Sequence, residues 1–408
     1  MNFLTELKEG LWISWDAIRA HKLRSTLTTL GIIIGVVTVT LMGTVIQGVN
    51  SAFLNSISFL GADTLYVSRN SWAEDSEEAW TRAQRRPRIT MDQARTVTEQ
   101  MTTARAVAPT AETMLPVSHK DRKSDAVHVV GTSEQFLLTA GFTVSEGRFL
   151  TAEECQGARP VCVIGQKVAT NLFENEPVIG NRLRAGGQTF EVVGVLEPQG
   201  GLFGALLDNQ IFVPLRQFVS AFRPWPNVEI QVKAASLETL EATREELHGV
   251  VRRVRRLPPG VPDDFAINTQ ESILNVWNRV AGSIAAVGMF VTGLSLFVGG
   301  IGIMNIMFVS VAERTKEIGI RKAIGAKRRT ILIQFLAEAA SICLLGGLIA
   351  LAIGWPLTLL IGRFMPATLS PLVVSIALLV SLLTGVVSGF LPAWRAARMN
   401  PVDALRSE

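Results

Sequence analysis

The sequence predicts an α-helical membrane protein with four transmembrane helices and a large α+β extracytoplasmic domain inserted between the first and second of them. Charged residues make up only 18% of the chain, and they gather in blocks with long gaps between them. Each gap exceeds the roughly 20 apolar residues that cross a bilayer. These charge-free stretches are Ser25–Ala62, Val280–Ala312, Ala339–Gly362 and Phe364–Trp394. Between the first two stretches lie about two hundred residues of mixed helix and strand pattern, enough for a folded domain.

Residues 1–24 are predicted to form an amphipathic helix that lies in the inner membrane interface. Its charged residues surround one apolar stripe with helical spacing, made of Leu4, Leu7, Leu11, Trp15 and Ile18. The apolar stretch that follows begins too late and runs too long for a secretory signal peptide. We therefore expect an uncleaved anchor.

Residues 25–60 and 271–312 are each predicted to form a transmembrane helix that continues outside the membrane as a stalk. The surplus of about a dozen residues in the first stretch, at about 1.5 Å each, would extend its helix by roughly 20 Å. The second stretch is preceded by residues with coiled-coil-like spacing, namely Ile273, Trp277, Val280 and Ile284. Two interpretations are possible: the extra turns form two stalk helices that pack on each other, or they only cap the domain. The matching lengths of the two extensions favour the stalk.

Residues 61–270 are predicted to form the extracytoplasmic α+β domain, with two subdomains. Alternating or continuous apolar runs predict strands at Thr64–Ser68, Ala126–Gly131, Val161–Ile164, Phe190–Leu196, Gln210–Pro214 and Val228–Val232. Gly186 and Gly187 predict a hairpin between 181–185 and 188–196. Helices are expected at Met91–Met101 and Leu237–Arg256. Thr90 with Gln93, and Thr151 with Glu154, have the spacing of capping boxes.

Residues 313–330 connect the second and third apolar stretches and are rich in charge. The segment contains seven basic residues, which are Arg314, Lys316, Arg321, Lys322, Lys327, Arg328 and Arg329. Dense Lys and Arg beside a span mark the cytoplasmic side of a membrane. We therefore expect 313–330 in the cytoplasm, followed by a third span at 331–362, a short outer loop at 363–370, a fourth span at 371–394 and a cytoplasmic C-terminal segment at 395–408.

The same segment also has the pattern of a short helix lying along the inner face of the membrane. Ile318, Ile320, Ala323 and Ile324 are interpreted as one apolar face, and Gly319 and Gly325 as sites of a turn or a close backbone approach. Composition alone allows a simpler interpretation, in which these charges only fix the orientation of the chain in the membrane.

Motifs for catalysis, phosphate binding and metal binding are not found. No stretch reads G-x-x-x-x-G-K-[ST], so this sequence predicts no ATP site of its own. The four histidines lack metal-ligand spacing, and no G-x-S-x-G elbow occurs. We expect no catalytic residue, no metal and no nucleic-acid partner, because the basic segments flank spans. A basic run at Arg252, Arg253, Arg255 and Arg256 is interpreted as the solvated face of a helix, with contact to an acidic partner as the alternative.

The cysteines divide by predicted compartment. Cys343 falls in the third span and is expected to be a packing residue. Cys155 and Cys162 fall close together in the domain predicted to face an oxidising compartment, where disulfides persist. A Cys155–Cys162 disulfide and two free thiols are both open at this point, because sequence does not give the geometry.

The order of residues in 313–329, ERTKEIGIRKAIGAKRR, closely resembles the cytoplasmic coupling segment of MacB-type, FtsX-like permeases of ABC transporters. VSEGRFLTAEE, CVIGQKVATNLF and IFVPLRQF resemble blocks of the extracytoplasmic domain of that family. GFLPAWRAARMNPVDALR resembles its last cytoplasmic signature. The resemblance therefore extends over nearly the whole chain.

This resemblance implies a permease subunit, not an enzyme, that acts by mechanotransmission as a homodimer or close heterodimer in the bacterial inner membrane. The basic residues near both ends of the chain predict that both termini lie in the cytoplasm. Two copies of a separate cytoplasmic ATPase would bind Mg-ATP, so the chain itself needs no cofactor; membrane lipid, a periplasmic adaptor and an outer-membrane duct are further expected partners. Residues implied in coupling to the ATPase are Glu313, Arg314, Thr315, Lys316, Glu317, Gly319, Arg321, Lys322 and Gly325. Glu317 and Arg321 are expected to pair across one helical turn.

Two functions remain open after the resemblance is considered. The first is export or extraction of a substrate such as a drug, peptide, lipoprotein or envelope component. Apolar spans without ionisable residues argue against a polar pathway between the helices and favour a lever. The alternative is FtsX-like signalling, in which the chain activates a cell-wall hydrolase and transports nothing. The large, many-stranded outer domain favours export.

Overall fold

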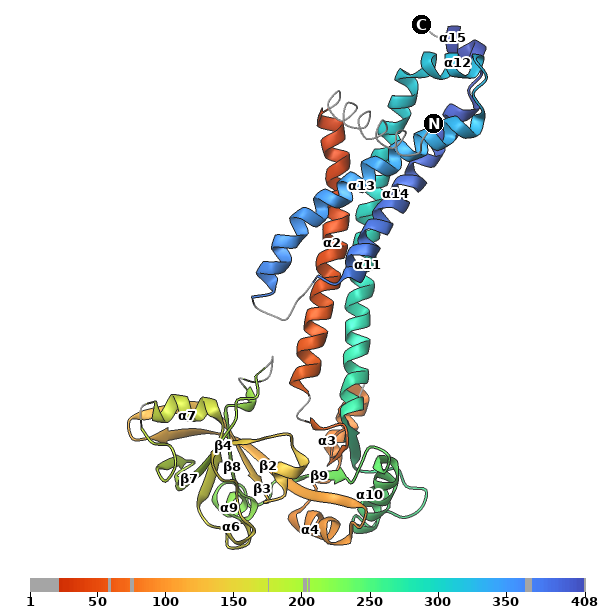
Figure 1. The fold of residues 1–408 in the computed structure, drawn as a ribbon. Helices are drawn as coiled ribbons and strands as arrows, with labels where there is room; N and C mark the ends of the chain where they lie inside the picture. The colour runs from red at the N-terminus through yellow and green to blue at the C-terminus, as the bar shows by residue number, and fades with distance from the viewer. Residues whose placement is uncertain are drawn as a thin grey trace. The chain divides into compact units, whose positions relative to one another are not determined.

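The computed structural model describes residues 22–57, 60–73, 77–174, 176–200, 204, 206–363 and 369–406. The predicted amphipathic helix therefore lies almost entirely outside the described residues. The chain divides into two units, one made of the residues up to Ser51 together with those from Val280 onward, and the other of Ala52–Arg279. Figure 1 shows the fold of each unit.

The first unit is a bundle of long apolar helices with two short helices at one end (Figure 1). The long helices are α2 Lys22–Ser56, α11 Gln270–Glu313, α13 Arg328–Ile361 and α14 Pro371–Arg398, and the short ones are α12 Thr315–Ala323 and α15 Pro401–Arg406. The long helices α2 and α11 each continue past the boundary between the units. All four long helices are long and apolar enough to cross a membrane.

Small residues allow these helices to approach closely. A Cβ atom added to Gly31 of α2 would lie 3.0 Å from the Cα of Gly299 in α11. At Gly385 of α14 it would lie 2.7 Å from the Sγ of Cys343 in α13. One hydrogen bond also joins α13 and α14, from the Ser381 hydroxyl to the Cys343 carbonyl oxygen at 2.5 Å. The glycine-rich stretches therefore serve close helix packing, as expected where apolar lipid gives helices no hydrophobic reason to associate.

The second unit is an α+β domain built on a 10-stranded sheet with the order β10-β1-β9-β2-β3-β8-β5-β7-β4, with β6 paired to β2 and β7. Its strands are β1 Thr64–Ser68, β2 Ala104–His119, β3 Arg122–Thr132, β4 Val144–Gly147, β5 Val161–Ile164, β6 Arg182–Ala185, β7 Gln188–Leu196, β8 Gln210–Pro214, β9 Glu229–Ala234 and β10 Ala266–Thr269. Its helices are α3 Glu77–Arg85, α4 Met91–Gln100, α5 Phe136–Thr139, α6 Ala152–Gln156, α7 Gln166–Phe173, α9 Leu215–Ala221 and α10 Leu240–Val254.

The predicted strands are all present, and the structure adds β2, β4 and β10. The glycine hairpin joins β6 to β7 in the expected register, and both capping boxes form. Strand β2 holds two sides of the domain together, because it pairs with β9 along one part of its length and with β3 along the other. The register of the β2–β3 pair shifts between Leu115 and Val117, where Pro116 has no N–H to donate to the ladder.

Within this unit, the end of α2 packs against the start of α11. The rings of Phe53 and Trp277 stack with centroids 4.4 Å apart and an interplanar angle of 14°. Ile57, Leu60 and Tyr66 form a buried cluster beside them, with Ile273 and Leu274 packed against it. The end of α2 and the start of α11 are therefore joined by aromatic and aliphatic contacts.

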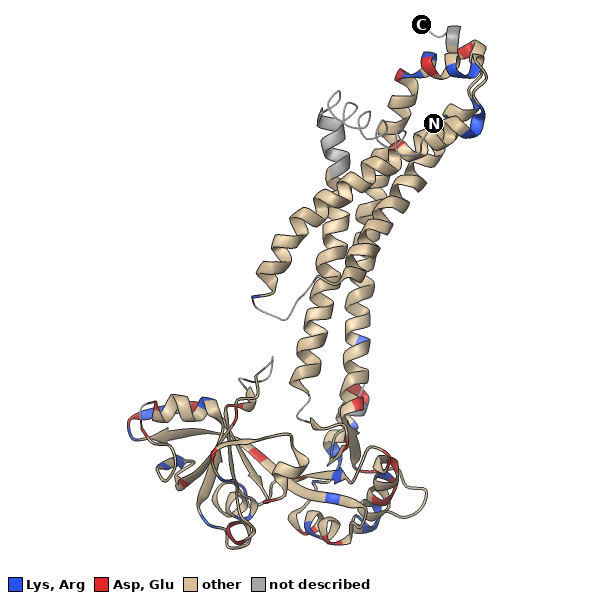
Figure 2. Ribbon diagram, viewed as in Figure 1, with Lys and Arg blue, Asp and Glu red and all other residues tan. Residues whose placement is uncertain are grey.

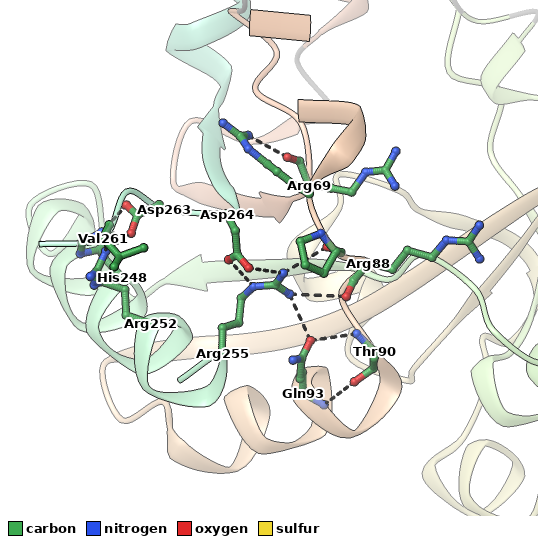
Figure 3. A network of polar contacts seen from close by, with 12 residues as sticks. Arg69, Arg88, Thr90, Gln93, His248, Arg252, Arg255, Val261, Asp263 and Asp264 are labelled. Carbon is green, nitrogen blue, oxygen red and sulfur yellow. Dashed lines mark hydrogen bonds and ion pairs between the residues drawn. The ribbon is translucent and has the colours of Figure 1, made fainter. Parts of the chain in front are cut away.

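The basic run after His248 differs from the prediction. Arg255 is 3% exposed and binds Asp264 with two hydrogen bonds, at 2.5 and 2.7 Å, while another of its nitrogens contacts the Gln93 side-chain oxygen at 3.2 Å. Arg252 pairs with Asp263, which also contacts the Nε2 of His248 at 2.8 Å (Figure 3). Arg252 and Arg255 therefore fasten the end of α10 to neighbouring segments, whereas Arg253 and Arg256 are exposed, so the solvated-face prediction holds for half of this run.

An ion pair between a buried glutamate and a half-exposed arginine fixes the start of α6. The Glu154 side chain is 6% exposed and accepts two hydrogen bonds from Arg148, at 2.7 and 2.8 Å, and another from the Thr151 backbone N–H. The Arg148 guanidinium, together with Thr151, holds the pKa of Glu154 at about 2, well below its usual range.

We predict that this pair makes the α+β domain sensitive to acid. Because the pKa of Glu154 is lower in the folded than in the unfolded chain, its contribution of roughly 2 kcal/mol is present above about pH 5 and is lost progressively as the pH falls toward 2. Glu154→Gln should lower the free energy of unfolding by that amount at neutral pH and flatten its decline in acid. Urea unfolding of the detergent-solubilised chain, followed by pulse proteolysis at several pH values, measures both effects.

Glu153→Gln is the matched control, because Glu153 is exposed and one residue away on the same helix. Equal unfolding free energies for Glu154→Gln and Glu153→Gln at neutral pH would contradict the prediction.

Candidate coupling site

The corner segment, Glu313–Gly325, leads from α11 through α12 to the turn before α13. Figure 2 shows that Lys and Arg gather around this end of the helical unit, where α12 and α15 lie side by side. The long helix α11 ends at Glu313, and the Thr315 hydroxyl donates a hydrogen bond of 2.8 Å to the Ala312 carbonyl oxygen. This hydroxyl satisfies a carbonyl group at the end of α11, so the chain can change direction at Arg314.

A glycine closes the far end of α12. Gly325 has a φ of +105°, which side chains with a Cβ rarely adopt. Its N–H donates to the Lys322 carbonyl oxygen at 3.0 Å, and the Ala326 N–H donates to the Arg321 carbonyl oxygen at 2.9 Å. These two bonds define a Schellman motif, which ends the helix by backbone contacts alone.

The Lys322 side chain fastens α12 to the C-terminal end of α14. Its ammonium group donates to the carbonyl oxygens of Ala397, at 2.7 Å, and Met399, at 2.5 Å. These carbonyl groups lack partners inside α14, and a cation at that position also complements the helix dipole. Partial burial, together with nearby Arg328, lowers the pKa of Lys322. The family resemblance assigned Lys322 to coupling with the ATPase. In the structure its ammonium group instead binds carbonyl oxygens within the helical unit.

The predicted pairing of Glu317 and Arg321 is present. The two side chains contact each other at 2.5 Å across one turn of α12, and each is about half exposed. Arg321 also donates to the side-chain oxygen of Gln334 in α13 at 2.7 Å. The pair therefore faces solvent on one side and braces α12 against α13 on the other.

Sequence reasoning missed the carboxylate beneath this pair. Glu338 in α13 is 4% exposed, and its carboxylate lies 3.4 Å from the Arg314 guanidinium. One signal in the sequence could have indicated this contact: Glu338 is a lone acid at the start of an apolar stretch, four residues after Gln334. The pair joins the corner segment to α13. Because removing either partner would leave an uncompensated buried charge, we infer that Arg314 and Glu338 hold the two segments together.

The predicted apolar face of the corner segment is divided in two. Ile318 and Gly319 are buried, whereas Ile320 is 49% exposed and Ile324 is 82% exposed. Glu313, Lys316 and Ala323 are also exposed. The single-face interpretation was wrong because residues 318 and 320 are separated by about 200° around a helix. The outer face of α12 thus combines two large apolar side chains with charged ones.

The two cysteines of the α+β domain are free thiols in the structure, which corrects the disulfide hypothesis. Cys162, in β5, lies fully buried in the cluster under α7 and α9. Cys155, in α6, packs against the separate cluster that contains Phe136 and Phe212. Because the two side chains belong to different cores, they do not meet. Burial raises the pKa of the Cys155 thiol to about 12, which makes it a poor nucleophile.

Within the described residues, no group of three or more His, Cys, Asp and Glu side chains is placed to hold a metal ion. The fold and the site define a class, which is a helical membrane protein with an α+β domain between its first two apolar helices in sequence. At the charged end of its helical unit it carries a braced corner with an exposed outer face.

Comparison with known proteins identifies the family. A model of the MacB-like periplasmic core domain matches residues 25–250, and a model of the FtsX-like permease C-terminal region matches residues 289–401. The uncharacterized ABC transporter permease YknZ of Bacillus subtilis is 33% identical over 98% of this chain and 100% of its own length. The chain belongs to the MacB/FtsX-type permeases of ABC transporters.

Other relatives are longer than this chain. The macrolide export ATP-binding/permease protein MacB of Rhodopirellula baltica is 33% identical, with 96% of this chain and 61% of that protein covered. The chain therefore spans about three fifths of that relative. Among solved structures, the periplasmic region of MacB from Actinobacillus actinomycetemcomitans matches with a TM-score of 0.45 at 16% identity, covering 54% of this chain and 95% of that one. The extracellular domain of YknZ matches with a TM-score of 0.40 at 18% identity, covering 50% of this chain and 98% of that one.

We predict that Lys322→Met loosens the corner segment without removing the protein from the membrane. The variant leaves the end of α14 without its donor, which should cost about 1–3 kcal/mol locally. Hydrogen exchange of the peptides covering α12 and α15 should become faster. Lys316→Met is the control, because Lys316 is exposed on the same helix, and equal exchange in the two variants would show that Lys322 anchors nothing.

Proposed function

We propose that this chain is the permease subunit of an ABC transporter in the bacterial inner membrane. It converts ATP hydrolysis by a cytoplasmic ATPase into motion of its extracytoplasmic domain, and that motion drives export or extraction of a substrate. The observation that carries this proposal is the corner segment, which is fixed on its inner side and presents Lys316, Glu317, Ile320 and Ile324 outward.

A rigid corner is what a lever needs at its input end. Arg314, Arg321 and Lys322 connect α12 to α13 and α14 by hydrogen bonds and ion pairs, so a force on the outer face passes to the long helices. At the output end, α2 and α11 are continuous helices joined to each other at the base of the α+β domain. Apolar spans, whose sequences contain no ionisable residue over 280–312 or 371–394, support motion of the helices over passage of polar solutes between them.

The partners follow from this mechanism. Two copies of an ABC ATPase, which bind Mg-ATP, would dock on the outer faces of two permease subunits arranged as a homodimer or close heterodimer. We place the ATPase on a separate chain, supported by the Bacillus subtilis relative whose whole length this chain covers. A periplasmic adaptor and an outer-membrane duct complete the proposed exporter. The substrate would be a drug, peptide, lipoprotein or envelope component.

The second candidate is transmembrane signalling without transport. It is motivated by the match of residues 289–401, which contain the whole corner segment, to the FtsX-like permease C-terminal model. In this case ATP-driven motion of the α+β domain would activate a cell-wall hydrolase. Isolation of the complex from native membranes separates the two candidates: an adaptor or duct in the complex supports export, and a hydrolase supports signalling.

The Glu317–Arg321 pair provides a sharp test of docking. We predict that Glu317→Lys alone abolishes coupling, and that the double exchange Glu317→Arg with Arg321→Glu also fails although it restores the pair within α12. The physical reason is that charges mismatched to a partner cost more than an exposed pair within one helix contributes. Complex formation with the ATPase and stimulation of ATP hydrolysis are the measurements.

The double variant also tests the alternative that the Glu317–Arg321 pair has only a structural role. If the pair only braces α12 against α13, the double variant regains the activity that Glu317→Lys loses, because a glutamate at 321 can accept from the Gln334 amide. Recovery of full coupling in the double variant would therefore remove the docking role from this pair. Membrane levels of both variants should equal those of the parent.

The proposed orientation puts both termini and Lys327 in the cytoplasm and the α+β domain outside. In a variant with its three cysteines replaced by alanine, we expect Arg253→Cys to react with a membrane-impermeant maleimide in intact spheroplasts. Lys327→Cys should react only after the membrane is opened. Labelling of Lys327→Cys in intact spheroplasts would reverse the topology, which rests on the asymmetry of Lys and Arg.

A further inference from the structure

A cavity of about 320 Å³ lies within the α+β domain, lined from strands β1, β2, β3, β8 and β9 and from α5. Its size is at the lower end of the range for small-molecule sites. Aromatic rings provide much of its wall, from Trp72, Phe136, Phe142 and Phe212. No residue of the corner segment, and no other residue proposed to act in coupling, lines this cavity.

Two carboxylates line this cavity, that of Glu229, which is partly buried, and that of Glu112, which is exposed to solvent. Glu229 of β9 lies opposite Thr110 of β2, and Glu112 lies two residues along β2 on the same face of the sheet. No described residue donates a hydrogen bond to the Glu229 carboxylate. Burial, together with the nearby charge of Glu112, raises the pKa of Glu229 to about 7. A carboxylate in such surroundings is costly unless something pairs with it.

The described residues that line the cavity include no Lys, Arg or His. Lys233 shares the face of β9 with Glu229, but its ammonium group is bound to Asp63 at 3.0 Å. The stretches of the domain outside the described residues, at 58–59, 74–76, 175, 201–203 and 205, contain no basic residue in the sequence. The protein therefore supplies no cation of its own from these positions to balance the two acids.

Two other polar groups of the wall already have partners. The Tyr66 hydroxyl donates to the Leu60 carbonyl oxygen at 2.6 Å, and the Gln231 side-chain oxygen accepts from the Thr139 hydroxyl at 3.0 Å. The aromatic rings pack at an angle to one another, with the Phe136 and Phe212 centroids 5.1 Å apart. Aromatic faces attract cations through their quadrupole, so acids and rings favour the same kind of guest.

We propose that this cavity binds a small organic cation, namely a protonated amine that carries an apolar body. The ammonium group would pair with Glu229 and Glu112, and the apolar body would lie against Phe136, Phe142 and Phe212. A bare metal ion fits less well, since Ca²⁺ takes 6–8 oxygen ligands and has no use for an aromatic wall. The site would let the outer domain recognise lipophilic amines independently of the ATPase.

The test uses a pair of probes that differ only in charge. 4-Phenylbutylamine and 4-phenylbutan-1-ol have the same apolar body, and the amine stays protonated at neutral pH like a lysine side chain. Calorimetric titration of the full chain in nanodiscs should show saturable binding of the amine and at least about tenfold weaker binding of the alcohol, as expected for loss of a charge-assisted hydrogen bond. Equal affinities for the two probes would overturn the assignment of charge recognition.

The affinity for the amine should rise between about pH 6 and pH 8, because Glu229 must be ionised to pair with it. The groups around Glu229 support this assignment. Glu112 of β2 carries the like charge, and the pKa of the Tyr66 hydroxyl, on β1, is raised by burial and by Glu229, so Tyr66 stays neutral. Asp63 and Lys233 are already paired with each other.

Two variants of the acids complete the experiment. Glu229→Gln and Glu112→Gln should each weaken amine binding by about tenfold or more while leaving the alcohol unaffected. Glu197→Gln is the control, since Glu197 is exposed and lies outside the cavity lining. Thermal unfolding guards against misfolding: Glu229→Gln removes an unpaired charge and should not lower the midpoint. Amine binding that is unchanged in both acid variants would be partition into lipid and would disprove the site.

Discussion

The ammonium group of Lys322 is the contact on which the arrangement of the corner segment depends. Every helix ends with carbonyl groups that have no partner inside it, and at the end of α14 two of them face α12. A single flexible side chain satisfies both and brings the short helix to rest against the bundle. The ion pair of Arg314 with Glu338 then fixes the other end of α12. With its inner side so occupied, α12 has only its outer face left for another molecule.

Much of the architecture could be predicted from the sequence because its signals are local. Long apolar stretches, glycine pairs and capping boxes are read over a few residues, and the corresponding helices, hairpin and caps are present. Strand β2 escaped prediction because Pro109 and Pro116 interrupt its pattern, yet the first pairs within the ladder and the second falls at a shift of register. Both prolines are tolerated because of how β2 pairs with strands distant in sequence. A short window of the sequence does not contain that information.

The candidate site was predicted as a segment and not as an arrangement. The Glu317–Arg321 pair follows from helical spacing and was found. The partners described above for Arg314, Lys322 and Arg255 lie between 9 and 162 residues away in the chain, and neither composition nor period indicates them. The same limit applies to Cys155 and Cys162, whose short separation suggested a bridge although α6 and β5 direct them into different cores.

In the turn after α12, the charge of the side chains and the shape of the backbone do not depend on each other. Because the Schellman motif at Gly325 is closed by main-chain groups, the side chains of Lys327, Arg328 and Arg329 take no part in shaping it. These basic side chains can therefore be exchanged without altering the backbone bonds that end α12. The charge of this turn and the form of α12 thus become independently adjustable, and an engineer could rewrite the basic cluster while the neighbouring helix kept its end.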